Sequence, residues 1–88
     1  MNNQDKTTIL FFNLVFSLQM TAMQQMGKIK NPITDKIEKN INEAETTIDI
    51  LDVLYIKTKG NLSEEEETYF SNVLKELKLN FIDEKNKD

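Results

Sequence analysis

Two aspartates and two tyrosines are the side chains in this sequence best suited to chemistry. Asp49 and Asp52 are three residues apart, so on a helix both carboxylates would share one face, where they could act as an acid–base pair or bind Mg²⁺. The chain has no histidine and no cysteine, which removes the commonest general base and the ligands of thiolate and Glu-x-x-His metal sites. Tyr55 and Tyr69 suit the edge of an apolar core better than acid catalysis. We therefore expect no catalytic residue, no bound metal and no cofactor.

A run of four carboxylates, Glu64 to Glu67, is a second place where a cation could bind. Consecutive side chains of a helix point in different directions, so these four cannot converge on one ion. The run suits the first turn of a helix instead, because the helix dipole favours negative charge there. Ser63, with Glu66 three residues later, also forms the pattern of a capping box. The run therefore predicts the start of a helix.

Phosphate and nucleic-acid ligands are also disfavoured. Gly27 and Gly60 are isolated, so the chain has no glycine-rich loop to hold phosphates. All eleven basic residues are lysines and the formal net charge is −4. Affinity for nucleic acids comes from neutralised phosphates, and guanidinium groups provide the commonest specific base contact. We expect no nucleic-acid partner.

The segment of about residues 7–26 is the most informative in the chain. It is predicted to be a helix that ends at Gly27, a residue suited to the left-handed conformation. At about 100° per residue, its apolar side chains cover about 200° of the circumference, interrupted only by Gln19. No charge occurs between Lys6 and Lys28. Since packing on one side of a small core needs little more than about 100°, this helix is expected to lie at the centre of the fold, to meet a second copy, or both.

The same segment has to be tested against membrane and export signals. Ile9–Leu18 has roughly the length of a signal-peptide core, but Asp5 precedes it and no suitable cleavage site follows. Gln19 and the polar residues after it interrupt a bilayer span. We expect a cytoplasmic protein. The alternative is a peripheral membrane protein or membrane-protein adaptor, with Ile9–Leu18 against lipid or an apolar groove, although interfacial helices usually carry Lys or Arg on their polar face.

An ordered loop is predicted over residues 28–41. It contains Asn31 before Pro32; asparagine favours turns, and the residue before proline avoids the helical region. Three isoleucines at a spacing of four are expected to attach this loop to the core: Ile29, Ile33 and Ile37.

The second helix is predicted at about residues 43–59. Asn42 would cap it, and Glu45 three residues later would complete a capping box. Val53 and Ile56 lie outside its main apolar stripe, so they are candidate contacts for a partner chain.

The third helix is predicted at about residues 64–82. A corner made by Gly60 and Asn61 leads into its cap at Ser63. Residues 83–88 are polar and have nothing to bury, so we expect this tail to fray.

Several segments together resemble one protein family. They are FNLVFSLQMTAMQQMG (residues 12–27), NINEAETTIDILDVLYIKTKGNL (40–62) before the acidic run, and VLKELKLNFID (73–83). The most specific part is Thr47-Ile48-Asp49 followed by Lys57-Thr58-Lys59-Gly60-Asn61-Leu62, in that order and spacing. In these features the chain resembles the bacterial family known as domain of unknown function 1844. The resemblance implies a small helical protein of the bacterial cytosol, and it carries no activity, cofactor or catalytic residue onto this chain.

The corner Lys57–Leu62 has two interpretations. It could be a recognition surface. It could also be structural only, with Gly60 in a special backbone conformation and Asn61-Leu62 setting the angle between the second and third helices.

Taken together, the sequence predicts one all-α domain, a three-helix antiparallel bundle or hairpin arrangement, assembled as a homodimer. Chains of 88 residues bury little more than about 60% of their unfolded surface. Lacking disulfides and metals, such small domains often gain stability by oligomerising. The expected function is that of a non-catalytic, self-associating interaction module, with another protein as a further partner.

The residues to which the sequence assigns a role fall into two groups. The predicted self-association face is Phe11, Phe12, Val15, Phe16, Met20 and Met23. The predicted structural caps and corner residues are Gly27, Asn42, Gly60, Asn61, Ser63 and Glu66.

Overall fold

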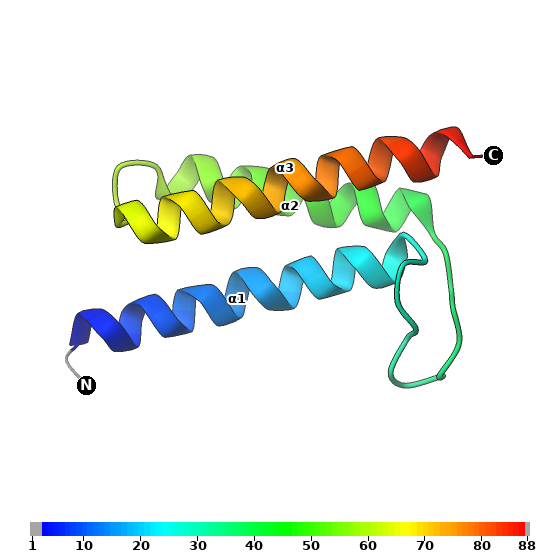
Figure 1. The fold of residues 1–88 in the computed structure, drawn as a ribbon, viewed down its shortest axis with the longest axis horizontal. Coiled ribbons are helices and arrows are strands. Elements are labelled where there is room, and N and C mark those ends of the chain that lie inside the picture. The colour runs from blue at the N-terminus through cyan, green and yellow to red at the C-terminus, as the bar shows by residue number, and fades with distance from the viewer. Residues whose placement is uncertain (1–2, 88) are drawn as a thin grey trace.

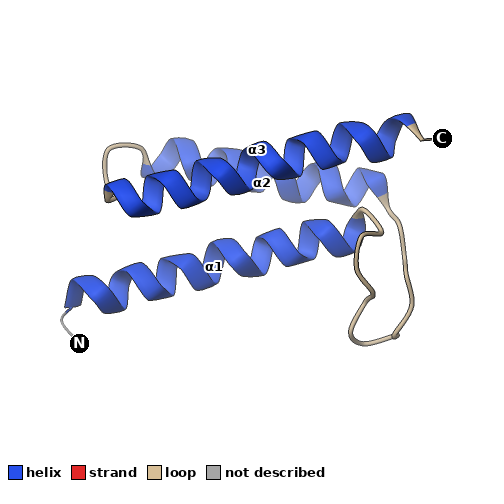
Figure 2. Ribbon diagram, in the orientation of Figure 1, coloured by secondary structure: helices blue, strands red, loops and turns tan. Residues whose placement is uncertain are grey.

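Three helices make up the chain in the computed structural model, which describes residues 3–87. They are α1 (Asn3–Gln25), α2 (Ile41–Thr58) and α3 (Glu64–Asn86). Figure 1 shows that α1 and α3 run in the same direction while α2 runs antiparallel to both, and each helix packs against the other two. Within residues 3–87 there is no strand, as Figure 2 shows. The loop contains one isolated bridge, between Asn31 and Lys36. The predicted all-α, three-helix fold is confirmed.

The core lies along the line where the three helices meet, and every helix contributes to it. Its buried apolar residues are Val15, Ala22 and Met26 from the first helical segment, Ala44, Ile48 and Leu51 from α2, and Phe70, Val73, Leu74 and Leu77 from α3. The ring of Phe70 lies 5.7 Å from that of Phe11 and 5.2 Å from that of Tyr55, centroid to centroid. Because these tilted and edge-on contacts come from both other helices, Phe70 ties the three together.

The end of α1 is built as the sequence indicates. Gly27 adopts φ +80°, the left-handed conformation that glycine enters without strain. The Lys28 N–H donates to the Met23 carbonyl at 2.9 Å, and the Gly27 N–H donates to the Gln24 carbonyl at 3.0 Å. This pair of bonds is a Schellman motif, which satisfies the last carbonyls of the helix and turns the chain into the loop.

The start of α2 differs from the prediction. Its cap is Asn40, not Asn42: the Asn40 side chain accepts a hydrogen bond from the Glu43 N–H at 3.1 Å. The same Asn-x-x-Glu spacing occurs at both asparagines, so the pattern alone does not separate them. The contact with α1 does, because the Asn40 N–H donates to the Gln25 carbonyl at 2.7 Å and fixes the chain there. Asn42 lies exposed in the first turn of α2.

The loop before α2 is ordered by its polar side chains. Asn31 Oδ1 accepts from the Ile33 N–H at 2.8 Å, and Glu38 accepts from both Asn31 and Thr34 at 2.8 Å. The prediction that isoleucines attach this loop to the core is wrong. Ile33 is 91% exposed, and Ile29 and Ile37 are exposed as well, because they lie outside the contact between the helices.

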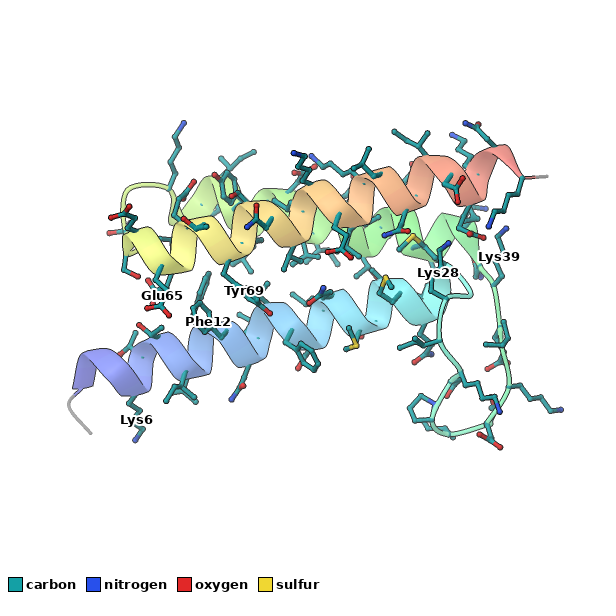
Figure 3. All side chains as sticks on the ribbon, in the orientation of Figure 1. Lys6, Phe12, Lys28, Lys39, Glu65 and Tyr69 are labelled. Carbon is teal, nitrogen blue, oxygen red and sulfur yellow. The ribbon has the colours of Figure 1, made fainter. Side chains whose placement is uncertain are left out.

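The C-terminal segment does not fray at residue 83. The α3 helix continues to Asn86, and the Glu84 side chain is only 9% exposed. Its carboxylate binds Lys28 at 2.6 Å, Lys39 at 3.2 Å and Lys87 at 2.8 Å. Figure 3 shows Lys28 and Lys39 at this end of α3. Ion pairing with the loop therefore extends the helix past the point where apolar burial stops.

Candidate self-association surface

Helix α1 is covered by the rest of the chain on one side only. Val15 and Ala22 face inward and are fully buried. On the outside, Ile9 is 46% exposed and Phe16 is 52% exposed, and Leu10 and Leu14 are also exposed. One part of α1 therefore lies at the centre of the fold, and another part is exposed.

Five apolar side chains form a continuous row along the partly exposed edge of α1 that borders α3, and we call them the α1 row: Ile9, Phe12, Phe16, Met20 and Met23. At 100° per residue they lie within about 80° of arc. The row is next to α3, since the ring of Phe12 lies 4.6 Å from that of Tyr69, and Figure 3 shows these two side chains meeting between the helices. Ile9 and Phe16 are exposed, while the other three are half-buried.

Four of the six residues predicted for the self-association face belong to this row. The other two serve the core. Val15 has no exposed surface, and Phe11 packs its ring against Phe70. Both lie on the side of α1 that faces the other helices, so Val15 is not available to a partner chain and Phe11 is half-buried. Ile9 was not predicted, yet it lies seven residues before Phe16, which is the spacing that keeps residues on one face over two turns.

Three polar side chains of α1 are hydrogen-bonded within the chain. The Ser17 and Thr21 hydroxyls donate to the carbonyls of Asn13 and Ser17, each at 2.9 Å. Thr47 of α2 donates to the Gln25 side chain at 2.6 Å. What α1 offers to a partner is therefore mainly apolar surface.

The candidate acid–base pair lies beside a shallow groove between α2 and α3. The groove has a volume of about 320 Å³, and its lining residues are Glu45, Ile48, Asp49, Asp52, Lys78, Phe81 and Ile82. Asp52 is bound to Lys78 at 2.8 Å, and Asp49 is exposed. Among the described residues no group of three or more acidic side chains is placed to hold a metal ion. Lys78 thus gives Asp52 a structural partner on the surface.

Tyr55 is also engaged within the chain. Its hydroxyl donates a hydrogen bond to the Glu67 carboxylate. This bond, together with burial, raises the pKa of Tyr55 above its ordinary value. The phenol therefore stays protonated near neutral pH, and its contact with Phe70 places its ring at the edge of the core.

The corner between α2 and α3 is hydrogen-bonded to α1. Gly60 adopts φ +87°, and the Asn61 N–H donates to the Thr58 carbonyl at 2.9 Å. Ser63 and Glu66 form a complete capping box at the start of α3. The Thr8 hydroxyl of α1 also donates to Glu66, at 2.8 Å. These bonds give the corner a structural role.

Charge is concentrated at the opposite end of the bundle, around Glu84. Hydrogen bonds from Lys28, and then from Lys87, lower the pKa of Glu84 to about 2. The same carboxylate raises the pKa of Lys87. The cluster is internally paired, and it fastens the loop to the end of α3.

None of the helices in residues 3–87 combines the length and the apolar character needed to cross a bilayer. No curated protein and no solved structure matches the chain. A family model matches residues 8–83. This range includes the buried core residues of all three helices. The chain therefore belongs to the family described as domain of unknown function DUF1844.

Proposed function

We propose that this protein is a non-catalytic, self-associating module, in which the α1 row of one copy packs against a second copy. The observation that carries the proposal is the exposure of Ile9 and Phe16 on a helix without a single charge from residue 7 to residue 27. Removing apolar surface from water is the main driving force of association, and it is opposed wherever charged groups must be desolvated along with it.

The exposed apolar residues of α2 and α3 do not offer an equivalent surface. Ile56 of α2 is followed by Lys57, and Leu79 of α3 follows Lys78, which is bound to Asp52. A partner covering these residues would have to desolvate the neighbouring charges. No charged residue lies between residues 7 and 27, so that penalty is smaller at α1 than at α2 or α3.

Light scattering coupled to size-exclusion chromatography tests the proposal. The wild-type protein is expected to show a dimer mass that falls toward the monomer on dilution. Phe16→Ser is expected to be monomeric at concentrations where the wild type is dimeric. Leu79→Ser is the matched control, because Leu79 is 61% exposed on α3 and lies outside the row, and it should keep the wild-type mass.

Two outcomes would contradict the proposal. One is a wild-type protein that is monomeric at every concentration up to the millimolar range. The other is co-sedimentation of the wild type, but not of Phe16→Ser, with vesicles of neutral or anionic lipid, because the apolar side of α1 would then have lipid as its partner. Circular dichroism of each variant checks that the helices remain formed.

A further inference from the structure

We infer that two copies pair through α1 in an antiparallel orientation, with the two-fold axis passing beside Phe16. This inference rests on the proposed function and specifies its interface. The α1 row is spaced by three, four, four and three residues from Ile9 to Met23, so it has the same pattern read from either end. In an antiparallel pair centred on Phe16, Ile9 of one copy lies level with Met23 of the other, and Phe12 lies level with Met20.

This arrangement leaves no gap in the apolar contact. Phe16 meets its own counterpart at the centre, and every other member of the row lies level with an apolar residue of the partner. The row spans fourteen residues, or about 21 Å at 1.5 Å per residue. Because a two-fold interface uses the same patch on both copies, a surface that matches its own reversal is what such an interface requires.

Charge favours the antiparallel orientation over the parallel one. The acidic first turn of α3 lies beside the N-terminal half of α1, where Thr8 binds Glu66, and Glu65 is seen there in Figure 3. At the other end of the bundle, three lysines, Lys28, Lys39 and Lys87, bind only two carboxylates, those of Asp83 and Glu84, so this end keeps an excess of positive charge. A parallel pair would bring two acidic turns together. An antiparallel pair brings each acidic turn toward the lysines of the partner, and it also opposes the helix dipoles of the two α1 helices.

The size of the interface sets the strength that the pair should have. A standard interface removes roughly 800 Å² from each partner, which is about one eighth of the 6112 Å² that this chain exposes. Only two members of the α1 row, Ile9 and Phe16, are exposed, so the row forms the centre of the contact and the adjoining edge of α3 at Tyr69 widens it. We therefore expect a dimer that dissociates on dilution.

Introduced cysteines test the orientation, and the absence of native cysteine makes the readout clean. The variants are Ile9→Cys and Met23→Cys, mixed at equal concentration under mild oxidation, with each variant alone as the comparison. Antiparallel pairing predicts a disulfide-linked dimer in the mixture and little in either single variant. Two copies of residue 9 would then be about 21 Å apart along the axis, whereas a disulfide needs Cα atoms within about 7 Å. Leu79→Cys measures the background of random collision.

Each result separates the inference from the proposed function. Dimers by light scattering, with Ile9→Cys or Met23→Cys linking to itself above the Leu79→Cys background, would mean parallel pairing and would overturn the inference alone. Dimers that link in no combination would place the interface elsewhere and would overturn it too. A monomeric mass for the unmodified protein would remove both proposals together.

Discussion

The Thr8 hydroxyl of α1 donates a 2.8 Å hydrogen bond to Oε2 of Glu66 in the first turn of α3. The other oxygen of that carboxylate, Oε1, accepts from the Ser63 N–H at 2.8 Å. The bond from Ser63, and then that from Thr8, holds the pKa of Glu66 below its ordinary value. One carboxylate therefore caps α3 and also aligns it with α1, at the end where the α1 row begins.

Removing the hydroxyl of Thr8 should weaken this alignment. Thr8→Val is expected to lower the free energy of unfolding by about 1.5 kcal/mol, the size of a hydrogen bond to a charged group. Urea denaturation at neutral pH measures it. Thr21→Val is the matched control on the same helix, because the exposed Thr21 hydroxyl bonds only to the Ser17 carbonyl. A control loss as large as that of Thr8→Val would show that helix propensity, and not the contact with Glu66, is responsible.

Alanine at the two glycines should separate backbone strain from crowding. Both have positive φ, so each substitution is expected to lower the free energy of unfolding by about 1–2 kcal/mol. A methyl group at Gly27 would also approach the Lys39 Cβ to 3.3 Å, whereas one at Gly60 meets nothing within 4 Å. Gly27→Ala should therefore destabilise more than Gly60→Ala in the same denaturation experiment, and the reverse order would contradict this account of the Gly27 turn.

The parts of the fold that the sequence predicts are those whose cause is local. Helical periodicity identifies all three helices, and the capping box at Ser63 and Glu66 marks the start of α3. The parts that it misses depend on contacts between distant residues. Glu84 lies in a polar tail, and its neighbours in the sequence do not indicate that it will form ion pairs with Lys28 and Lys39. Asn40 becomes the cap of α2 only through its bond to Gln25.

The candidate self-association surface could also be predicted from the sequence only in part. An apolar arc of about 200° indicates that α1 has more than one contact surface. It does not indicate which side the two other helices cover. Val15, Phe11, Phe12 and Phe16 are all apolar, and only the structure shows that Val15 is fully buried and that Phe11 packs against Phe70.

Because of the Glu84 cluster, the stability of the fold should depend on pH. The pKa of Glu84 falls from 4.5 to about 2 in the folded chain. The ion pairs therefore stabilise the fold fully at pH values above the pKa that Glu84 has in the unfolded chain. That contribution is lost progressively as the pH falls from about 5 to about 2. The Glu84→Gln variant has no titratable side chain at this position. Its Tm is expected to be lower than that of the wild type at pH 7, and the difference should shrink as the pH approaches 2.

Glu76→Gln supplies the comparison for this experiment, because Glu76 is an exposed glutamate of the same helix. It should follow the wild-type curve of Tm against pH across the whole range. If the Glu84→Gln curve also ran parallel to that of the wild type, the lysines around Glu84 would not be stabilising the fold through its charge.

The strength of self-association should depend little on salt, since the α1 row is uncharged. Screening acts on the exposed charges at the ends of the bundle, which favour the antiparallel orientation, but it does not act on the burial of Phe16 and its neighbours. Raising the salt from about 0.05 M to about 0.5 M is therefore expected to change the dissociation constant by less than about threefold. Sedimentation velocity at a series of protein concentrations measures it, with Leu79→Ser run beside the wild type. A weakening of tenfold or more would mean that charged groups, and not the apolar row, supply most of the affinity.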